Sequence, residues 1–133
     1  MAGAEGAGPG PEAEGEAETA GPSDEEALRR LERLADRLRV VGPRLAGREG
    51  EAAQQLLREI RAGLQRIADL AAEADGEPSR VVPELAAHAL GDQALVLGHD
   101  LLRGPDPSGG LGRRPAAVQA AALRAFEDIS RLI

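Results

Sequence analysis

The chain has no cysteine, no lysine, no tryptophan and no tyrosine among its 133 residues, and Phe126 is its only aromatic side chain. The lack of cysteine excludes a disulfide framework, a thiolate zinc site and a cysteine nucleophile. The lack of lysine excludes a Walker-type phosphate loop. The lack of aromatic faces argues against a platform for single-stranded nucleic acid, where bases stack. The abundance of alanine, glycine and arginine is typical of a GC-rich genome, so we expect a bacterial protein.

A long apolar run is also missing from the sequence. No stretch approaches the roughly 18 apolar residues that a membrane span needs. The first residues, MAGAEGAGPG, have neither the basic region nor the apolar core of a signal peptide. We therefore expect a cytoplasmic protein with no membrane partner.

Negative charge is concentrated at the N-terminus. Residues 1–26 carry eight acidic residues and no basic one, whereas the rest has fifteen acidic residues against sixteen arginines. That nearly neutral body lacks the basic field of a nucleic-acid binder, so we expect no nucleic-acid partner. Residues 1–22 are rich in Gly, Pro, Glu and Ala and have little apolar surface to offset the entropy of ordering. We predict that they form a disordered acidic arm.

After the arm, apolar residues recur at helical spacing. Ser23 followed by Glu26 is a capping-box pattern, and it predicts a helix that Gly42-Pro43 stops. The charged face of this helix is predicted to be solvated, with i,i+4 pairs such as Glu26–Arg30. A second helix is predicted from about Glu49 to Ala74, because it has the widest apolar stripe and ends in a Gly-Pro turn.

The third helix is predicted to run from Val81 or Pro83 to Leu102. A loop follows from Arg103 to Arg114, and Pro115 is predicted to open a fourth helix. Four helices joined by short loops predict an all-α, up-down four-helix bundle with a disordered acidic N-terminal arm. Residues 23–133 would be its single domain.

The segment HALGDQALVLGHD, residues 88–100, holds both histidines of the chain and two aspartates. On a helix His88 and Asp92 could share a metal ion, but His99 would lie about 16 Å from His88 at 1.5 Å per residue. The apolar faces of the second and fourth helices carry no carboxylate or imidazole to complete a site. We therefore expect no metal site and no cofactor.

The same segment resembles part of the pattern around the active histidine of histidine phosphotransfer domains, over residues 88–101. The matching residues are His88, Leu90, Ala94, Leu97, Gly98 and Leu101. The resemblance implies a helical bundle in which His88 accepts a phosphoryl group. The chain departs from the family where Gly91 replaces a lysine and where Asp92 replaces a small residue. Because the charge of Asp92 would repel a phosphoryl group, we do not favour phosphoryl transfer. The sequence has no other catalytic motif, so we expect no enzyme.

A helix-turn-helix is the alternative interpretation of this segment. Ala87, Gly91 and Leu97 have a spacing that such motifs use. The recognition helix would then be Gln93 to Leu102, which offers no arginine to base edges or phosphates. A transcription-associated DNA-binding protein is therefore the alternative function and not the favoured one.

Packing accounts best for the segment, because a heptad-like spacing places its polar residues in one seam of the third helix. The seam consists of Val81, Leu85, His88, Asp92, Leu95, His99 and Leu102. The opposite face, with Leu90, Leu97 and Leu101, is apolar throughout, so we expect it to enter the core and leave the seam as a candidate interface. We predict a non-catalytic helical interaction or adaptor protein that binds a protein partner or forms a homodimer.

Overall fold

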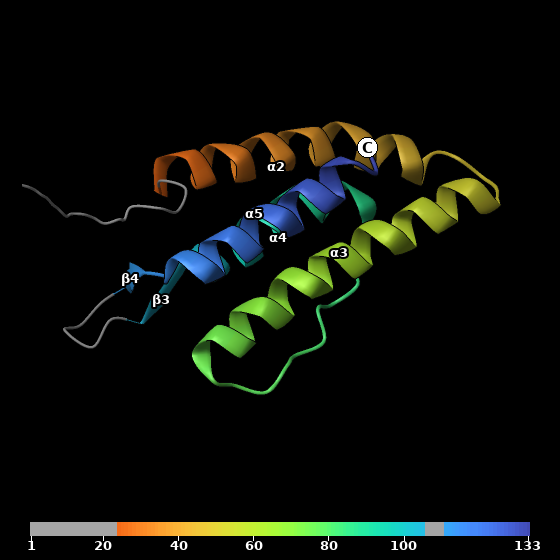
Figure 1. The fold of residues 1–133 in the computed structure, drawn as a ribbon. Coiled ribbons are helices and arrows are strands. Elements are labelled where there is room, and N and C mark those ends of the chain that lie inside the picture. The colour runs from red at the N-terminus through yellow and green to blue at the C-terminus, as the bar shows by residue number, and fades with distance from the viewer. Residues whose placement is uncertain (1–23, 106–110) are drawn as a thin grey trace, which may run out of the picture.

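The computed structural model describes residues 24–105 and 111–133, and four α-helices make up most of this part (Figure 1). They are α2 (Asp24–Ala46), α3 (Glu51–Asp75), α4 (Leu90–Leu102) and α5 (Ala116–Ser130). The predicted all-α four-helix bundle is confirmed. None of the helices in the described residues has an apolar stretch that could cross a bilayer. The predicted disordered arm and the Ser23 cap lie outside the described residues.

α3 is the helix that follows most directly from local sequence. Its buried residues recur at helical spacing and are Ala53, Leu57, Ile60, Leu64, Ile67, Leu70 and Ala71. Gly76, with φ of +67°, ends the helix: the amides of Gly76 and Glu77 donate to the carbonyls of Glu73 and Ala72 at 3.2 and 2.9 Å. This pair of bonds around a left-handed glycine is the Schellman motif. The predicted helix is confirmed, with its ends shifted by no more than two residues.

α2 does not stop at Gly42-Pro43 as predicted but continues to Ala46 with Pro43 inside it. Proline removes one backbone donor and crowds the preceding turn, which is why a stop was expected. The extra turn persists because Leu45, only 3% exposed, lies in the core. Gly42 is also buried, and a Cβ at this position would collide with the carbonyl of Ala87. The turn is therefore retained by tertiary packing.

The predicted third helix begins later than expected, at a short 3-10 turn, η1 (Ala87–Ala89), that leads into α4. Residues 77–86, which we call the strap, have no regular secondary structure. Gln65 of α3 donates to the carbonyl of Arg80 at 2.8 Å and accepts from the amide of Val82 at 2.9 Å. One turn earlier on α3, Arg61 donates to the carbonyl of Leu85 at 2.8 Å. These bonds hold the strap extended against α3 and prevent it from continuing α4.

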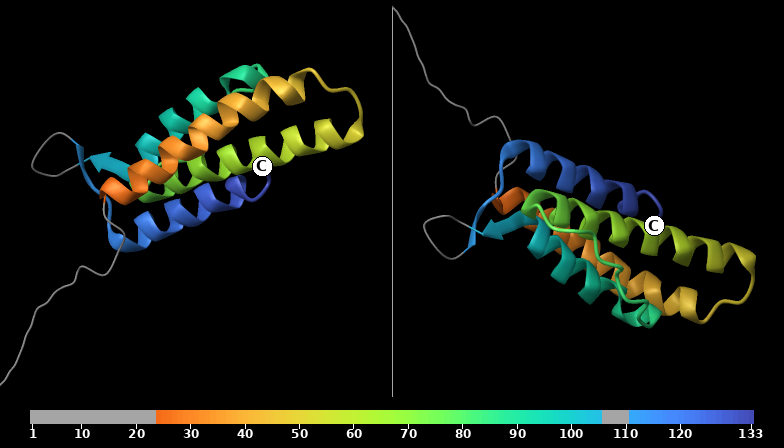
Figure 2. Two further views of the ribbon diagram at one scale, coloured as in Figure 1. Left: turned by 90° about the horizontal axis from the view of Figure 1, so that it is seen from above. Right: turned by 90° about the horizontal axis from the view of Figure 1, so that it is seen from below.

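The strap also sets the directions of the helices. It leads the chain back along α3 before α4 begins, so α3 and α4 run in the same direction (Figures 1 and 2). α4 is antiparallel to α2, since Asp92 contacts Arg39 and Gly98 faces Leu31. The directions are therefore up, down, down, up, and not the simple alternation that short loops would give.

The segment from Arg103 to Arg114, predicted as a loop, contains a small antiparallel ribbon. β3 (Arg103–Pro105) pairs with β4 (Leu111–Arg113), with Gly104 opposite Gly112. Pro115 directly precedes α5, so the fourth helix begins one residue later than predicted. The ribbon reverses the chain and brings α5 back beside α3.

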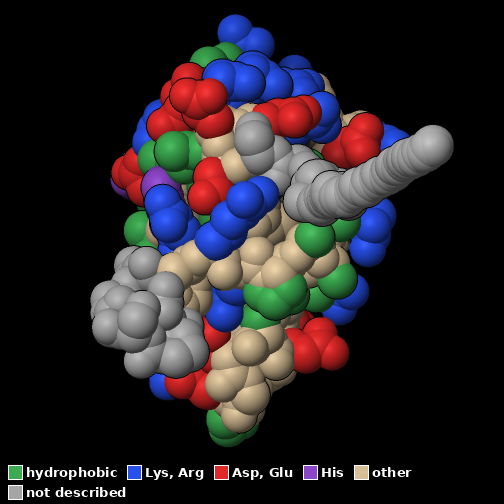
Figure 3. Space-filling view, turned by 60° about the vertical axis from the view of Figure 1, so that its left-hand side comes forward, with side chains coloured by type: hydrophobic (Ala, Val, Ile, Leu, Met, Phe, Trp, Pro, Cys, Tyr) green, Lys and Arg blue, Asp and Glu red, His purple; other side chains and the backbone are tan. Residues whose placement is uncertain are grey.

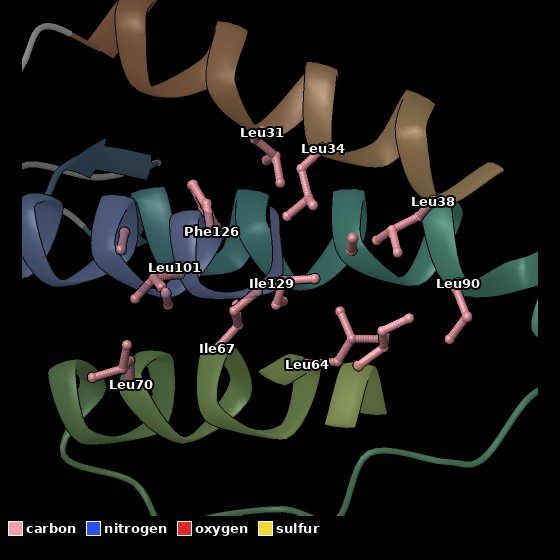
Figure 4. Packing of buried hydrophobic residues seen from close by; sticks show 14 of the residues in the cluster. Leu31, Leu34, Leu38, Leu64, Ile67, Leu70, Leu90, Leu101, Phe126 and Ile129 are labelled. Atoms are coloured by element: carbon pink, nitrogen blue, oxygen red, sulfur yellow. The ribbon is translucent and has the colours of Figure 1, made fainter. Parts of the chain in front are cut away.

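Side chains from all four helices meet in one core (Figure 4). The largest fully buried members include Leu31, Leu34, Leu38, Ile60, Leu64, Ile67, Leu90, Leu101, Phe126 and Ile129. On α4 the predicted inward face is confirmed for Leu90 and Leu101, which have no exposed surface, while Leu97 is half-buried. α4 approaches α2 closely at Gly91, where a Cβ would lie 2.6 Å from the carbonyl oxygen of Ala35.

Candidate functional site

The structure does not bring the seven residues of the predicted seam onto one face. Val81 and Leu85 lie on the strap and not on α4, with 88% and 44% of their surface exposed. Leu95 is half-buried, and Leu102 is only 7% exposed and belongs to the core. A continuous apolar stripe along one helix is therefore absent from this part of the chain, because the hydrogen bonds of the strap separate its first two members from the rest.

Asp92, a polar member of the seam, has a partner within the chain. Its carboxylate accepts hydrogen bonds from Nε and Nη2 of Arg39 on α2, at 3.3 and 3.0 Å. Arg39 also donates to Asp36 at 2.8 Å. The hydrogen bond from Arg39 to Asp92 is the largest contribution that raises the pKa of the Arg39 guanidinium above its ordinary value. Asp92 thus links α4 to α2 on the surface.

The two histidines lie in different surroundings. His88 is exposed in η1, whereas His99 is exposed on α4 and lines a shallow groove with Asp24 and Glu25 at the start of α2. Figure 3 shows a histidine side chain at the surface beside acidic and basic ones. Among the residues that the structure describes, no three His, Asp or Glu side chains gather closely enough to hold a metal ion. The two imidazoles therefore do not act as one site.

The helix-turn-helix interpretation does not find its geometry here. Residues 83–86 belong to the strap, and η1 continues directly into α4. Gly91 lies inside α4, packed on α2, where the motif would need a turn between two helices. The segment therefore consists of one helix preceded by an extended segment, and it does not form the two crossing helices of a helix-turn-helix.

A groove with a volume of about 400 Å³ lies between α3, the strap and α4, near the former seam. We call it the strap groove. Its apolar lining consists of Ala68, Ala71, Ala72, Pro78, Val81, Val82, Pro83 and Leu97. Its charged lining consists of Asp75, Glu77, Arg80, Asp100 and Arg103. Of the seven predicted interface residues, only Val81 lines it.

Polar side chains hold one wall of the strap groove in place. Gln65 and Arg61 bind the strap to α3, as described above, and Gln93 of α4 donates to the carbonyl of Pro83 at 2.8 Å. Gln93 is only 9% exposed, so its side chain is a buried link between α4 and the strap. The strap, which forms one wall of the groove, is therefore anchored to both α3 and α4.

A second groove lies between α2 and α5, with a volume of about 310 Å³. We call it the arginine groove, because Arg30, Arg33 and Arg37 of α2 line it. Its other lining residues are Leu34, Leu123, Phe126, Glu127 and Ser130. The predicted pair of Arg30 with Glu26 is confirmed at 3.0 Å.

Neither groove was predicted from the sequence, and the reasons differ. The strap groove depends on a tertiary arrangement, although three alanines at one edge of the α3 stripe, Ala68, Ala71 and Ala72, are a local signal of space beside the helix. The arginine groove had a clearer signal, since Arg30, Arg33 and Arg37 fall on one edge of α2 at 100° per residue. The acidic residues between these arginines instead led to the prediction of a solvated face of mixed charge.

Comparisons of the chain with models of protein families, with curated proteins and with solved structures find no match.

Proposed function

We propose that this chain is a non-catalytic helical interaction protein that binds a partner protein in the strap groove. The observation that carries the proposal is Val81, which is 88% exposed between two residues whose backbone groups are bonded to Gln65. A single exposed valine is ordinary, but this one borders an apolar groove that it shares with Leu97. An anchored apolar side chain beside a concave surface is typical of a binding site.

The lining of the strap groove indicates the chemistry of the partner. Three alanines on α3 leave room for an apolar side chain between the strap and α4. The surrounding lining carries charges of both signs: Glu77 and Asp100 are negative, and Arg80 and Arg103 are positive. An apolar anchor flanked by charges of both signs would complement such a surface.

A partner protein suits the strap groove better than a second copy of this chain does. A two-fold dimer needs one patch that is complementary to itself. The seam that was expected to supply such a patch is divided between the strap and α4, and Leu102 is buried. We also propose a bacterial, cytoplasmic protein, on the basis of its composition.

Site-specific photocrosslinking tests the proposal. A photoreactive residue at Val81 should crosslink one protein from an extract of the native host, while the same residue at Val40 should not. Val40 is the matched control, since it is a valine 53% exposed on α2. The captured protein is then purified and its affinity measured. Val81→Glu should weaken binding at least about tenfold, or about 1.4 kcal/mol, and Val40→Glu should leave it unchanged.

Several outcomes would overturn the proposal. They are an absence of crosslinks at Val81, equal crosslinking at both positions, or an affinity that Val81→Glu does not reduce. Capture of the chain itself, with a dimer seen by light scattering, would replace the partner protein by a second copy. Neither glutamate variant should unfold the chain, because both valines are exposed. Circular dichroism, which should be the same for both variants, checks this.

A further inference from the structure

The charged side chains of α2 are divided between two edges. On the edge toward α4, Arg39 pairs with both Asp36 and Asp92, so its positive charge is neutralised there. On the edge toward α5, Arg33 and Arg37 make no ion pair or side-chain hydrogen bond with any residue that the structure describes. The arginine groove therefore carries positive charge that the described part of the chain leaves unneutralised.

The floor of the arginine groove is apolar and its acidic content is low. Leu34 and Phe126, which are 1% and 2% exposed, lie beneath the arginines. Glu127 is the only acidic residue in the lining, and Arg131 pairs with it at 3.5 Å. An acidic segment with small side chains would thus find two free guanidinium groups above an apolar floor.

The chain itself contains such a segment. Residues 1–22 carry five glutamates and no basic residue, and four of the five alternate with small residues in EAEGEAE, residues 12–18. This segment is joined to the first residue of α2, the helix that carries the arginines. Charge complementarity and connectivity therefore point to the same groove.

The chain that joins the acidic segment to α2 also has a length that matches the distance to the arginines. Arg33 and Arg37 follow Asp24 by nine and thirteen residues, which is about 14 and 20 Å along the helix at 1.5 Å per residue. Glu18 and Glu12 precede Asp24 by six and twelve residues. A flexible chain of these lengths would span about 13 and 19 Å on average. A linker whose mean span matches the distance to its site gives the highest effective concentration.

We propose that the acidic segment of residues 12–18 docks in the arginine groove of its own chain. Its glutamates pair with Arg33 and Arg37, and its alanines and glycine lie over Leu34 and Phe126. The contact is intramolecular and electrostatic, so salt should weaken it. An acidic segment of another protein would have to displace the arm, which makes the arm a competitor for that surface. This proposal does not depend on the strap groove.

A spin label on the arm provides the test, and the lack of cysteine in the chain makes the labelling specific. Ala17→Cys carries the label, and paramagnetic broadening is measured at backbone amides. We expect broadening at residues 33–37 and 123–130 in about 20 mM salt and its loss in about 500 mM salt. Arg33→Glu with Arg37→Glu should remove the broadening.

The matched control is Arg58→Glu with Arg66→Glu on α3, which changes the net charge equally and should leave the broadening intact. Arg58 and Arg66 are also exposed. Circular dichroism checks that each variant folds. The proposal is overturned if no broadening appears, if it appears elsewhere, or if both double variants abolish it. Broadening in a mixture of labelled chain and isotope-enriched unlabelled chain would show docking between copies, which also overturns it.

Discussion

Arg114 joins three helices at one point. It is 7% exposed, and its guanidinium donates to the carbonyls of Leu101 and Asp100 at 3.0 and 2.9 Å and to the carboxylate of Asp75 at 2.6 Å. These two carbonyls belong to the last turn of α4, where backbone carbonyls have no hydrogen-bond donor within the helix. The backbone carbonyl of Arg114 accepts a hydrogen bond from the side chain of Gln119 on α5 at 2.9 Å. The ends of α3 and α4 and the start of α5 are therefore fixed by one residue.

Replacing Arg114 by methionine should lower the free energy of unfolding by about 2–4 kcal/mol, because it leaves a partly buried carboxylate and two carbonyls without their donor. Arg114→Lys should recover little of the loss, since one ammonium group cannot reproduce the fork of the guanidinium. Urea unfolding followed by circular dichroism measures both.

The neighbouring Arg113 supplies the control for Arg114. It is 56% exposed and pairs with Asp24 at 3.1 Å. Exposed pairs of this kind contribute about 0–1 kcal/mol, so Arg113→Met should have a small effect. Equal losses for the two methionine variants would contradict the structural role assigned to Arg114.

At the scale of elements, α3 provides the central face of the core. Ile60 and Ile67 have no exposed surface. Changing either to alanine should cost about 2–5 kcal/mol, since it removes buried methyl groups and leaves a cavity. Leu56 is half-buried at the margin of the same stripe, so Leu56→Ala should lower the free energy of unfolding by clearly less. Denaturant titration of the three variants checks this order, and a loss below about 0.5 kcal/mol for both isoleucines would remove α3 from the core.

The strap is an element held by side chains and not by a ladder of backbone bonds. Gln65→Ala removes both of its hydrogen bonds to the strap while leaving the α3 stripe intact. We expect hydrogen exchange at the Val82 amide to accelerate by about tenfold or more, because its acceptor is lost and the segment opens locally. The amides of Ile60 and Leu64 should exchange as before.

Gln55→Ala is the control for the strap. Gln55 is a glutamine of α3 that bonds only to Glu59 and Arg58 on its own helix, among the hydrogen bonds of the described residues. It should leave exchange at Val82 unchanged. If exchange at Val82 also stays slow in Gln65→Ala, the strap is held by its apolar contacts instead.

At the scale of the whole molecule, the chain combines an acidic segment with a nearly neutral bundle. Deleting residues 1–22 should change the melting temperature by no more than a few degrees at physiological salt, because the segment has no apolar face to bury. Docking in the arginine groove agrees with this expectation, since exposed ion pairs contribute little to stability. Calorimetry of the full-length and shortened chains measures the difference, and a larger drop would show that the arm is part of the bundle.

The features that depend on neighbouring residues could be predicted from the sequence. The stripe from Leu57 to Leu70 and the left-handed Gly76 define α3, because both act within one or two turns of helix. The apolar side of α4, with Leu90 and Leu101, was also correct, since burying it leaves no polar group without a partner. The all-α class follows from such local patterns.

The ends of α2 and α4, in contrast, depend on partners that are distant in the sequence. α2 passes Pro43 because Leu45 reaches the core, and α4 starts at Leu90 because Gln65 and Gln93 bind the backbone of the strap. Those bonds join residues ten or more positions apart, so no helical period reveals them. The candidate site moved for the same reason: Val81 was placed on a helix by its spacing, and the structure places it at the edge of a groove.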